Sequence, residues 1–135
     1  MTSMRLWART APIAICIAIA FAASASATTP LTMMVFFDYD KTDLSTQAEI
    51  TLKAFATVVG ERRAAQAVVA GNTDTAEASV ALSLARAEVV KSRLVELGVP
   101  SDRIRILAQG DARLLVKTTP GQREVQNRRV ELWLE

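Results

Sequence analysis

The sequence contains no histidine and one cysteine, Cys16. Without histidine the chain has no Ser-His-Asp or Cys-His triad, no zinc site of the usual kind and no imidazole for acid–base catalysis. A lone cysteine forms no disulfide within the chain. Aromatic residues make up 5% of the sequence, and Tyr39 and Trp133 stand too isolated to form a platform for stacking sugars. Carboxylates and arginines remain as the reactive side chains, and we expect no cofactor and no bound metal.

The first 27 residues have the features of a secretory signal peptide. Basic residues near the start precede an apolar run, residues 11–23, and the segment ends in the small-residue motif Ala25-Ser26-Ala27. We predict cleavage after Ala27, export of the chain and a single domain over residues 28–135. An uncleaved membrane anchor is the alternative, but the apolar run is shorter than the roughly 20 residues that a membrane helix needs.

Removing this segment changes the charge of the chain. The whole sequence has 16 Lys and Arg against 14 Asp and Glu, and the excess consists of Arg5 and Arg9. The remaining domain is therefore neutral, which argues against nucleic acid as a partner and against electrostatic attachment to a membrane surface. Its length is typical of one domain with one hydrophobic core, and we expect no membrane span within it.

Hydrophobic periodicity predicts strands and helices in alternation. Short apolar or alternating runs predict strands at residues 33–37, 66–70, 103–109 and 129–135. Apolar residues at spacings of three and four predict one helix from Asp43 or Ser45 to Gly60 and another that ends at Gly98 and Pro100. Residues 110–126 are predicted as a loop with one short helical turn after Pro120. This order predicts an α/β (α+β) sandwich, in which both helices pack on one face of a small mixed sheet.

The second predicted helix has two distinct stripes of side chains. The stripe that we expect to face the core is apolar and comprises Val80, Leu84, Ala87, Val90, Leu94 and Leu97. The other stripe is polar and comprises Ser79, Ser83 and Arg86, spaced at i, i+4 and i+7. The polar stripe runs toward the preceding loop, which carries Asp74.

Asp74 and Arg86 are the strongest candidates for a binding site. One carboxylate and one guanidinium on a rigid support suit a small zwitterion that carries both an ammonium and a carboxylate group. Purely structural roles are the alternatives. Asp74 could cap the following helix, and Arg86 could form a solvent-exposed pair with Glu77 or Glu88, which would contribute little stability.

Five short motifs occur in the order seen in OmpA-like C-terminal domains. They are FDYD at 37–40, GNTD at 71–74, LSLARA at 82–87, LGV at 97–99 with RI at 103–104, and NRRVE at 127–131. The chain therefore resembles a stand-alone member of this peptidoglycan-binding family, and the resemblance spans residues 35–134. It implies noncovalent binding of the peptide stem of peptidoglycan, chiefly through the diaminopimelate residue of that stem. With the predicted signal peptide, it also implies a periplasmic location, associated with the cell wall or outer membrane.

The resemblance also implies roles for individual residues. Asp74, which follows Thr73 in the GNTD motif, would contact the ammonium group of the ligand, and Arg86 would contact a carboxylate of the ligand. Phe37 and Asp38 would shape the pocket. Arg129 is the remaining candidate, followed by Asn127 and Arg128 of the same motif. Plain structural readings stay open for three of these residues, since Asp38 could be a solvated loop residue, Asn127 part of a turn, and Arg129 a strand residue that pairs across the sheet.

The segment between Asp74 and Arg86 departs from the family pattern. It is shorter than in most members, it contains no glycine, and Ser79 stands where the family usually has asparagine. These departures motivate a second hypothesis, in which the domain has lost the wall ligand and serves as a protein-interaction scaffold within an envelope complex.

A third hypothesis, hydrolysis of the cell wall, needs two carboxyl groups on either side of the substrate. Asp38 and Asp74 could approach one another, but both would lie beside arginines that keep carboxylates ionised, so neither suits a general acid. We therefore expect that the protein is not an enzyme.

Overall fold

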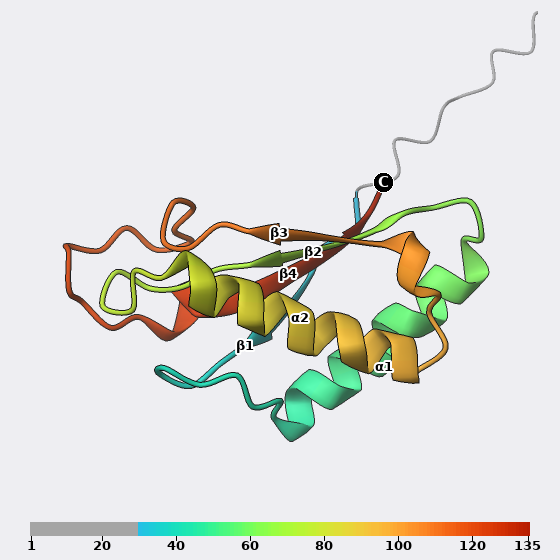
Figure 1. Ribbon diagram of the computed structural model, residues 1–135, viewed down its shortest axis with the longest axis horizontal. Helices are drawn as coiled ribbons and strands as arrows, with labels where there is room; N and C mark the ends of the chain where they lie inside the picture. Colours follow the sequence, from blue (N-terminus) through green and yellow to red (C-terminus); the bar gives the residue numbers. More distant parts are fainter. Residues whose placement is uncertain (1–29) are drawn as a thin grey trace, which may run out of the picture.

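The computed structural model describes residues 30–135, and the predicted signal peptide, residues 1–27, lies outside the described residues. The predicted alternation of strands and helices is confirmed (Figure 1). In chain order, the elements are β1 (Met33–Phe36), α1 (Thr46–Glu61), β2 (Ala67–Gly71), α2 (Val80–Glu96), β3 (Ile104–Ala108) and β4 (Arg129–Leu134). Short 3-10 turns at Ser101–Arg103 and Val125–Asn127 precede β3 and β4, and the second of these is the turn expected after Pro120.

The four strands form one mixed sheet in the order β1-β4-β2-β3. β4 lies in the middle and runs antiparallel to both β1 and β2, whereas β2 and β3 are parallel. Parallel neighbours need a long crossover connection, and α2 provides it. Neither helix in the described part of the chain is long and apolar enough to cross a membrane.

Both helices pack on one face of the sheet, as predicted. The hydrophobic core joins sheet residues such as Val69 and Leu132 to Phe55 from α1 and Leu94 from α2. Val69 and Leu132 are register partners on neighbouring strands, so their side chains share one face of the sheet. α1 begins where the sequence predicts, because the Ser45 side chain accepts a hydrogen bond of 3.1 Å from the backbone N–H of Ala48.

The prediction that the apolar stripe of α2 faces the core is wrong in the first half of the helix. Val80 and Leu84 are 61% and 39% exposed, whereas Ser83 and Arg86 are fully buried. The first half of α2 covers the loops at the end of the sheet, where polar backbone groups need partners. Ser83 supplies one, because its hydroxyl accepts a bond of 2.9 Å from the backbone N–H of Gly110. The apolar pattern holds only farther along α2, where Ala87, Val90 and Leu94 are buried.

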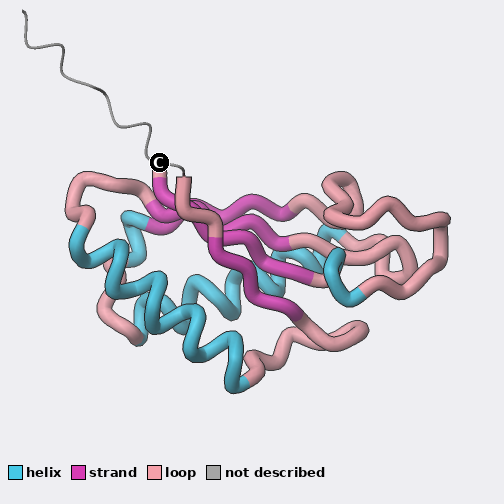
Figure 2. The backbone as a smooth tube through the Cα atoms, turned by 180° about the vertical axis from the view of Figure 1, so that it is seen from behind, coloured by secondary structure: helices cyan, strands magenta, loops and turns pink. Residues whose placement is uncertain are grey.

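The connections that carry the candidate residues gather at one end of the sheet. The β1–α1, β2–α2 and β3–β4 connections lie together at the left end in Figure 1 and at the right end in the reverse view of Figure 2. The α1–β2 and α2–β3 connections lie at the opposite end. The first three connections therefore enclose the region in which we expect the binding site.

Gly71, the last residue of β2, allows α2 to approach the sheet closely. A Cβ atom at this position would lie 1.9 Å from the backbone carbonyl oxygen of Ser83. No side chain fits in that space unless the helix moves. The glycine thereby places the loop after β2 directly beside the first half of α2.

We expect Gly71→Ala to lower the free energy of unfolding by about 3 kcal/mol or more, because the added methyl group collides with rigid helix backbone. Urea denaturation followed by circular dichroism measures this loss. Gly60→Ala is the matched control, since nothing lies within 4 Å of a Cβ at that helical position, and it should change stability by less than about 1 kcal/mol, toward greater stability. Equal stability of the two variants would contradict the close contact at Gly71.

Candidate functional site

Arg86 lies on the buried side of α2, and every N–H group of its guanidinium has a partner. Nε donates to the carbonyl oxygen of Lys41 at 3.0 Å. Nη1 donates to the carbonyl oxygen of Asn72 at 3.2 Å and to Glu77 Oε1 at 2.8 Å. Nη2 donates to the carbonyl oxygen of Asp38 at 3.1 Å and to Glu77 Oε2 at 2.5 Å. A guanidinium has five such donors, so the hydrogen-bonding capacity of Arg86 is fully used.

The carboxylate of Glu77 is the counter-charge of Arg86. Besides the two bonds from Arg86, it accepts bonds from the backbone N–H groups of Asp40 at 2.7 Å and Asp74 at 3.3 Å. The side chains of Arg86 and Glu77 are 0% and 1% exposed. Glu77 is therefore the partner that the structural alternative for Arg86 named. The alternative expected a solvent-exposed pair, whereas the pair is buried and bidentate, which is the stronger form of such a contact.

Asp74 has a separate set of partners. Its Oδ1 accepts from the backbone N–H of Glu77 at 2.8 Å, and its Oδ2 accepts from the backbone N–H of Glu124 and from Arg128 Nη1, both at 3.0 Å. Burial raises the pKa of this carboxyl, but the two backbone hydrogen bonds and the contact with Arg128 outweigh burial and leave the pKa below its ordinary value of 3.8. Asp74 is thus held as an anion within a buried ion pair.

Asp74 and Glu77 also bond to each other in the pattern of a capping box. The Asp74 side chain accepts from the Glu77 backbone, and the Glu77 side chain accepts from the Asp74 backbone. The backbone N–H of Ala78 bonds to the carbonyl oxygen of Asp74 at 2.9 Å, which closes a single turn. The alternative in which Asp74 caps α2 is wrong, because Ser79 is the N-cap of α2. Asp74 caps the separate turn before it.

Phe37, Asp38 and Thr73 lie around these two ion pairs. The buried ring of Phe37 faces the guanidinium of Arg86, with 5.2 Å between the Arg86 Cζ and the ring centroid, which is within cation–π range. Asp38 contributes its carbonyl oxygen to Arg86, while the residue itself is exposed. The buried hydroxyl of Thr73 accepts a long bond of 3.4 Å from the backbone N–H of Ser79. The structure therefore brings these three residues together with Asp74 and Arg86.

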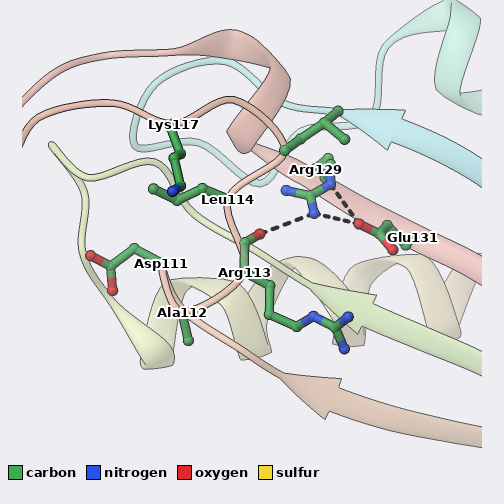
Figure 3. Close-up of a pocket in the computed structure, with 8 residues that line it drawn as sticks. Asp111, Ala112, Arg113, Leu114, Lys117, Arg129 and Glu131 are labelled. Carbon is green, nitrogen blue, oxygen red and sulfur yellow. Dashed lines mark hydrogen bonds and ion pairs between the residues drawn. The ribbon is translucent and has the colours of Figure 1, made fainter.

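Arg129 is buried, and its side chain bonds to a different set of partners. Its Nε donates to Glu131 at 2.7 Å and its Nη2 to the carbonyl oxygen of Arg113 at 3.0 Å. The pair with Glu131 lies along one strand, so the expected pairing across the sheet is not what the structure has. Arg129 lines a pocket of about 560 Å³ together with Asp111 and Lys117 from the β3–β4 connection (Figure 3).

Asn127 anchors the β3–β4 connection. Its side-chain oxygen accepts from the backbone N–H groups of Leu115 and Val116 at 2.8 and 2.9 Å, and its side-chain nitrogen donates to the carbonyl oxygen of Val116 at 2.8 Å. The side-chain hydrogen bonds of Asn127 and Arg129 thus go to this connection and to Glu131, and none goes to Asp74 or Arg86.

Two residues of the site were underrated: Glu77 was considered only as a solvent-exposed partner of Arg86, and Arg128 was ranked below Arg129. The spacing Asp74-x-x-Glu77 is that of a capping box and was a usable signal for Glu77. Arg128 had no comparable signal, because Arg128 and Arg129 are adjacent and the sequence does not distinguish which of them reaches Asp74. The structure assigns Arg128 to Asp74, and Arg128 also donates to the carbonyl oxygen of Phe37 at 3.0 Å.

Comparison with known proteins identifies the family of this chain. The sequence model described as the OmpA family matches residues 36–128, which include β2, α2 and β3 and all the connections around the two ion pairs. The chain belongs to the OmpA family. This OmpA-family domain is 37% identical over 116 residues to an outer membrane protein of Gluconacetobacter diazotrophicus, covering 79% of this chain and 31% of that protein.

Other relatives are similar over the same region. The peptidoglycan-associated lipoprotein of Pseudomonas putida is 34% identical over 100 residues, which cover 72% of this chain and 60% of that protein. This chain therefore spans less than two thirds of the length of both relatives. The crystal structure of the peptidoglycan-associated lipoprotein from Burkholderia pseudomallei superposes with a TM-score of 0.68 at 28% identity, covering 76% of this chain and 89% of that one. The OmpA-like domain of FopA1 from Francisella tularensis shares the fold, with a TM-score of 0.69 at 21% identity, covering 77% of this chain and 71% of that one.

The lowered pKa of Asp74 predicts an acid-sensitive contribution to stability. A carboxyl whose pKa is lower in the folded than in the unfolded chain stabilises the fold above its unfolded pKa, and this contribution is lost as the pH falls through the folded pKa. We expect Asp74→Asn to be less stable than the wild type at pH 7 by about 2 kcal/mol, because charge-assisted hydrogen bonds are lost. The difference should shrink as the pH falls from about 4 to about 2.

Urea denaturation at a series of pH values measures this effect. Asp111→Asn, at an exposed carboxyl, is the matched control. A stability difference between wild type and Asp74→Asn that stays constant down to about pH 2 would contradict a lowered pKa for Asp74.

Proposed function

We propose that this domain binds peptidoglycan noncovalently and so associates with the cell wall, with the diaminopimelate residue of the stem peptide held at Arg86 and Asp74. One observation carries the proposal. The guanidinium of Arg86 and the backbone N–H groups of Asp40 and Asp74 converge on a single carboxylate, which here belongs to Glu77. The site is therefore built to receive a carboxylate.

The two internal ion pairs match the two charges of an amino-acid headgroup. Glu77 supplies a carboxylate to Arg86, and Arg128 supplies a cation to Asp74. Both pairs meet at one turn, because Glu77 bonds to Asp74 through its backbone as well as through its side chain. A ligand with a carboxylate and an ammonium group on one carbon, such as the free end of diaminopimelate, offers the same two charges.

The relatives support peptidoglycan as the source of this ligand. The proteins from Pseudomonas putida and Haemophilus influenzae that are 34% and 32% identical to this chain are both peptidoglycan-associated lipoproteins. So is the protein from Burkholderia pseudomallei whose crystal structure is 28% identical. Together with the predicted signal peptide, these relatives favour a periplasmic location at the cell wall.

The chemistry of the site favours binding over catalysis. A general acid needs a carboxyl that is protonated near neutral pH. The backbone hydrogen bonds and the ion pair with Arg128 lower the pKa of Asp74 in spite of its burial, so this carboxyl is a poor proton donor.

The scaffold hypothesis remains a second candidate, and one observation favours it. Arg86 and Asp74 already have internal partners, Glu77 and Arg128, so both charges are neutralised without any ligand. A domain of this kind could keep the fold of the family and contact another envelope protein through some other surface.

We expect the purified protein to co-sediment with isolated peptidoglycan sacculi, and we expect Arg86→Ala and Asp74→Ala to reduce the bound fraction at least tenfold. Removing one partner of a buried ion pair costs about 3–5 kcal/mol, so folding of each variant is first checked by circular dichroism. Arg93→Ala is the matched control, because Arg93 lies on the same helix and forms partly exposed pairs with Glu49 and Glu96. It should bind as the wild type does.

Amide NMR of the wild type during titration with free diaminopimelate tests the site without any variant. Binding at the proposed site should shift the signals of Asp40, Asp74 and Glu77 and leave those of the opposite end of the sheet unchanged. If the wild type neither co-sediments with sacculi nor responds to millimolar diaminopimelate, the scaffold hypothesis replaces the proposed function.

A further inference from the structure

We infer that Glu77 is an internal ligand of this site. Its carboxylate occupies the place on Arg86 that an external carboxylate would take, so the Glu77 side chain must leave before an external carboxylate binds. The inference rests on the proposed function for the identity of the external ligand, diaminopimelate. We call the groups that bind the Glu77 carboxylate, namely the guanidinium of Arg86 and the backbone N–H groups of Asp40 and Asp74, the receptor. The structure shows this receptor occupied by Glu77.

The receptor has no capacity for a second carboxylate while Glu77 is bound. Both nitrogens that Arg86 presents to a carboxylate donate to Glu77, and the other N–H bonds of Arg86 go to backbone carbonyl groups. The two side chains are 0% and 1% exposed, so solvent does not reach the contact. An external carboxylate therefore cannot bind beside Glu77 and has to replace it.

The receptor is built mostly from parts that do not depend on Glu77. Arg86 belongs to α2, and its guanidinium is oriented by the carbonyl oxygens of Asp38, Lys41 and Asn72 and by the ring of Phe37. The backbone N–H of Asp40 comes from the β1–α1 connection. All of these groups lie outside the turn that carries Glu77.

Glu77 itself lies on a single turn outside the helices and strands. The turn consists of residues 75–77 and is followed by Ala78, which has a φ of +37°. This left-handed conformation is unfavourable for a residue with a Cβ. Withdrawal of the Glu77 side chain would break no helix or sheet hydrogen bond, while Thr75 in the same turn stays bonded to Thr119 and Gln122. The Glu77 side chain can thus leave the receptor without unfolding the domain.

A tethered carboxylate competes strongly with a free one. Glu77 is held close to Arg86 by the chain, so its effective concentration at the receptor is high, and the affinity for an external carboxylate is reduced by the small fraction of molecules in which the receptor is empty. Removing the Glu77 carboxylate should therefore increase the affinity for ligand, whereas removing a residue that contacts the ligand would decrease it.

The test compares the full protein with its Glu77→Ala and Glu77→Gln variants. Glu88→Ala is the matched control, because Glu88 is exposed on α2. By isothermal titration with diaminopimelate, we expect Glu77→Ala to show a dissociation constant at least tenfold lower than that of the wild type or of Glu88→Ala. In thermal denaturation, sodium acetate should raise the melting temperature of Glu77→Ala saturably above the effect of sodium chloride at equal ionic strength, and should not do so for the wild type.

Two further measurements apply if Glu77→Ala does not fold, since that variant leaves Arg86 without a counter-charge. Glu77→Gln keeps the volume of the side chain but places an amide against groups that all donate, so it too should bind diaminopimelate more tightly than the wild type. In the wild type, the ¹³C signal of the Glu77 carboxyl should move on saturation with diaminopimelate, because that carboxylate is released.

The outcomes separate this inference from the proposed function. If the wild type binds sacculi and the Glu77 variants bind diaminopimelate no more tightly, or if the Glu77 carboxyl signal stays unchanged on saturation, the inference is wrong and the proposed function stands. If acetate stabilises Glu77→Ala while no variant binds diaminopimelate or sacculi, the internal ligand stands and peptidoglycan binding is wrong. If acetate has no effect and nothing binds, both are wrong.

Discussion

The buried guanidinium of Arg86 is the interaction on which the arrangement of this end of the domain depends. A charge away from water is costly unless it is paired and fully hydrogen-bonded. Arg86 meets this requirement by drawing together carbonyl groups of the β1–α1 connection, a carbonyl group after β2 and the carboxylate of Glu77. Two connections, residues 38–41 and 72–77, are thus held against α2 by one side chain.

The fold could be predicted from the sequence because its signals are local. Alternating and short apolar runs marked the strands, apolar residues at spacings of three and four marked the helices, and Ser45 marked the start of α1 by its capping side chain. The crossover of α2 between the parallel strands β2 and β3 follows from the order of the elements. The motif order, in turn, indicated the family that the comparison with known proteins confirms.

The site could be predicted only in part, because contacts between loops leave no periodic pattern of apolar residues in the sequence. The apolar stripe of α2 was assigned to the core along its whole length, yet the first half of the helix faces loop backbone, where Ser83 and Arg86 are the suitable residues. Asp74 and Arg86 were identified from the sequence, but of their partners only Glu77 was considered, as one of two acids that could pair with Arg86 at the surface. Which acid reaches Arg86, and which of two adjacent arginines reaches Asp74, depends on loop geometry that spacing alone does not determine.

The ion pair between Glu77 and Arg86 affects how the domain can fold. Because a side chain of the same polypeptide neutralises Arg86, the chain can complete its fold with Arg86 and Asp74 both paired and no other molecule present. A domain whose arginine relied on an outside anion would carry an uncompensated buried cation until it met one. Under the proposed function, binding of a ligand carboxylate would exchange it for the carboxylate of Glu77.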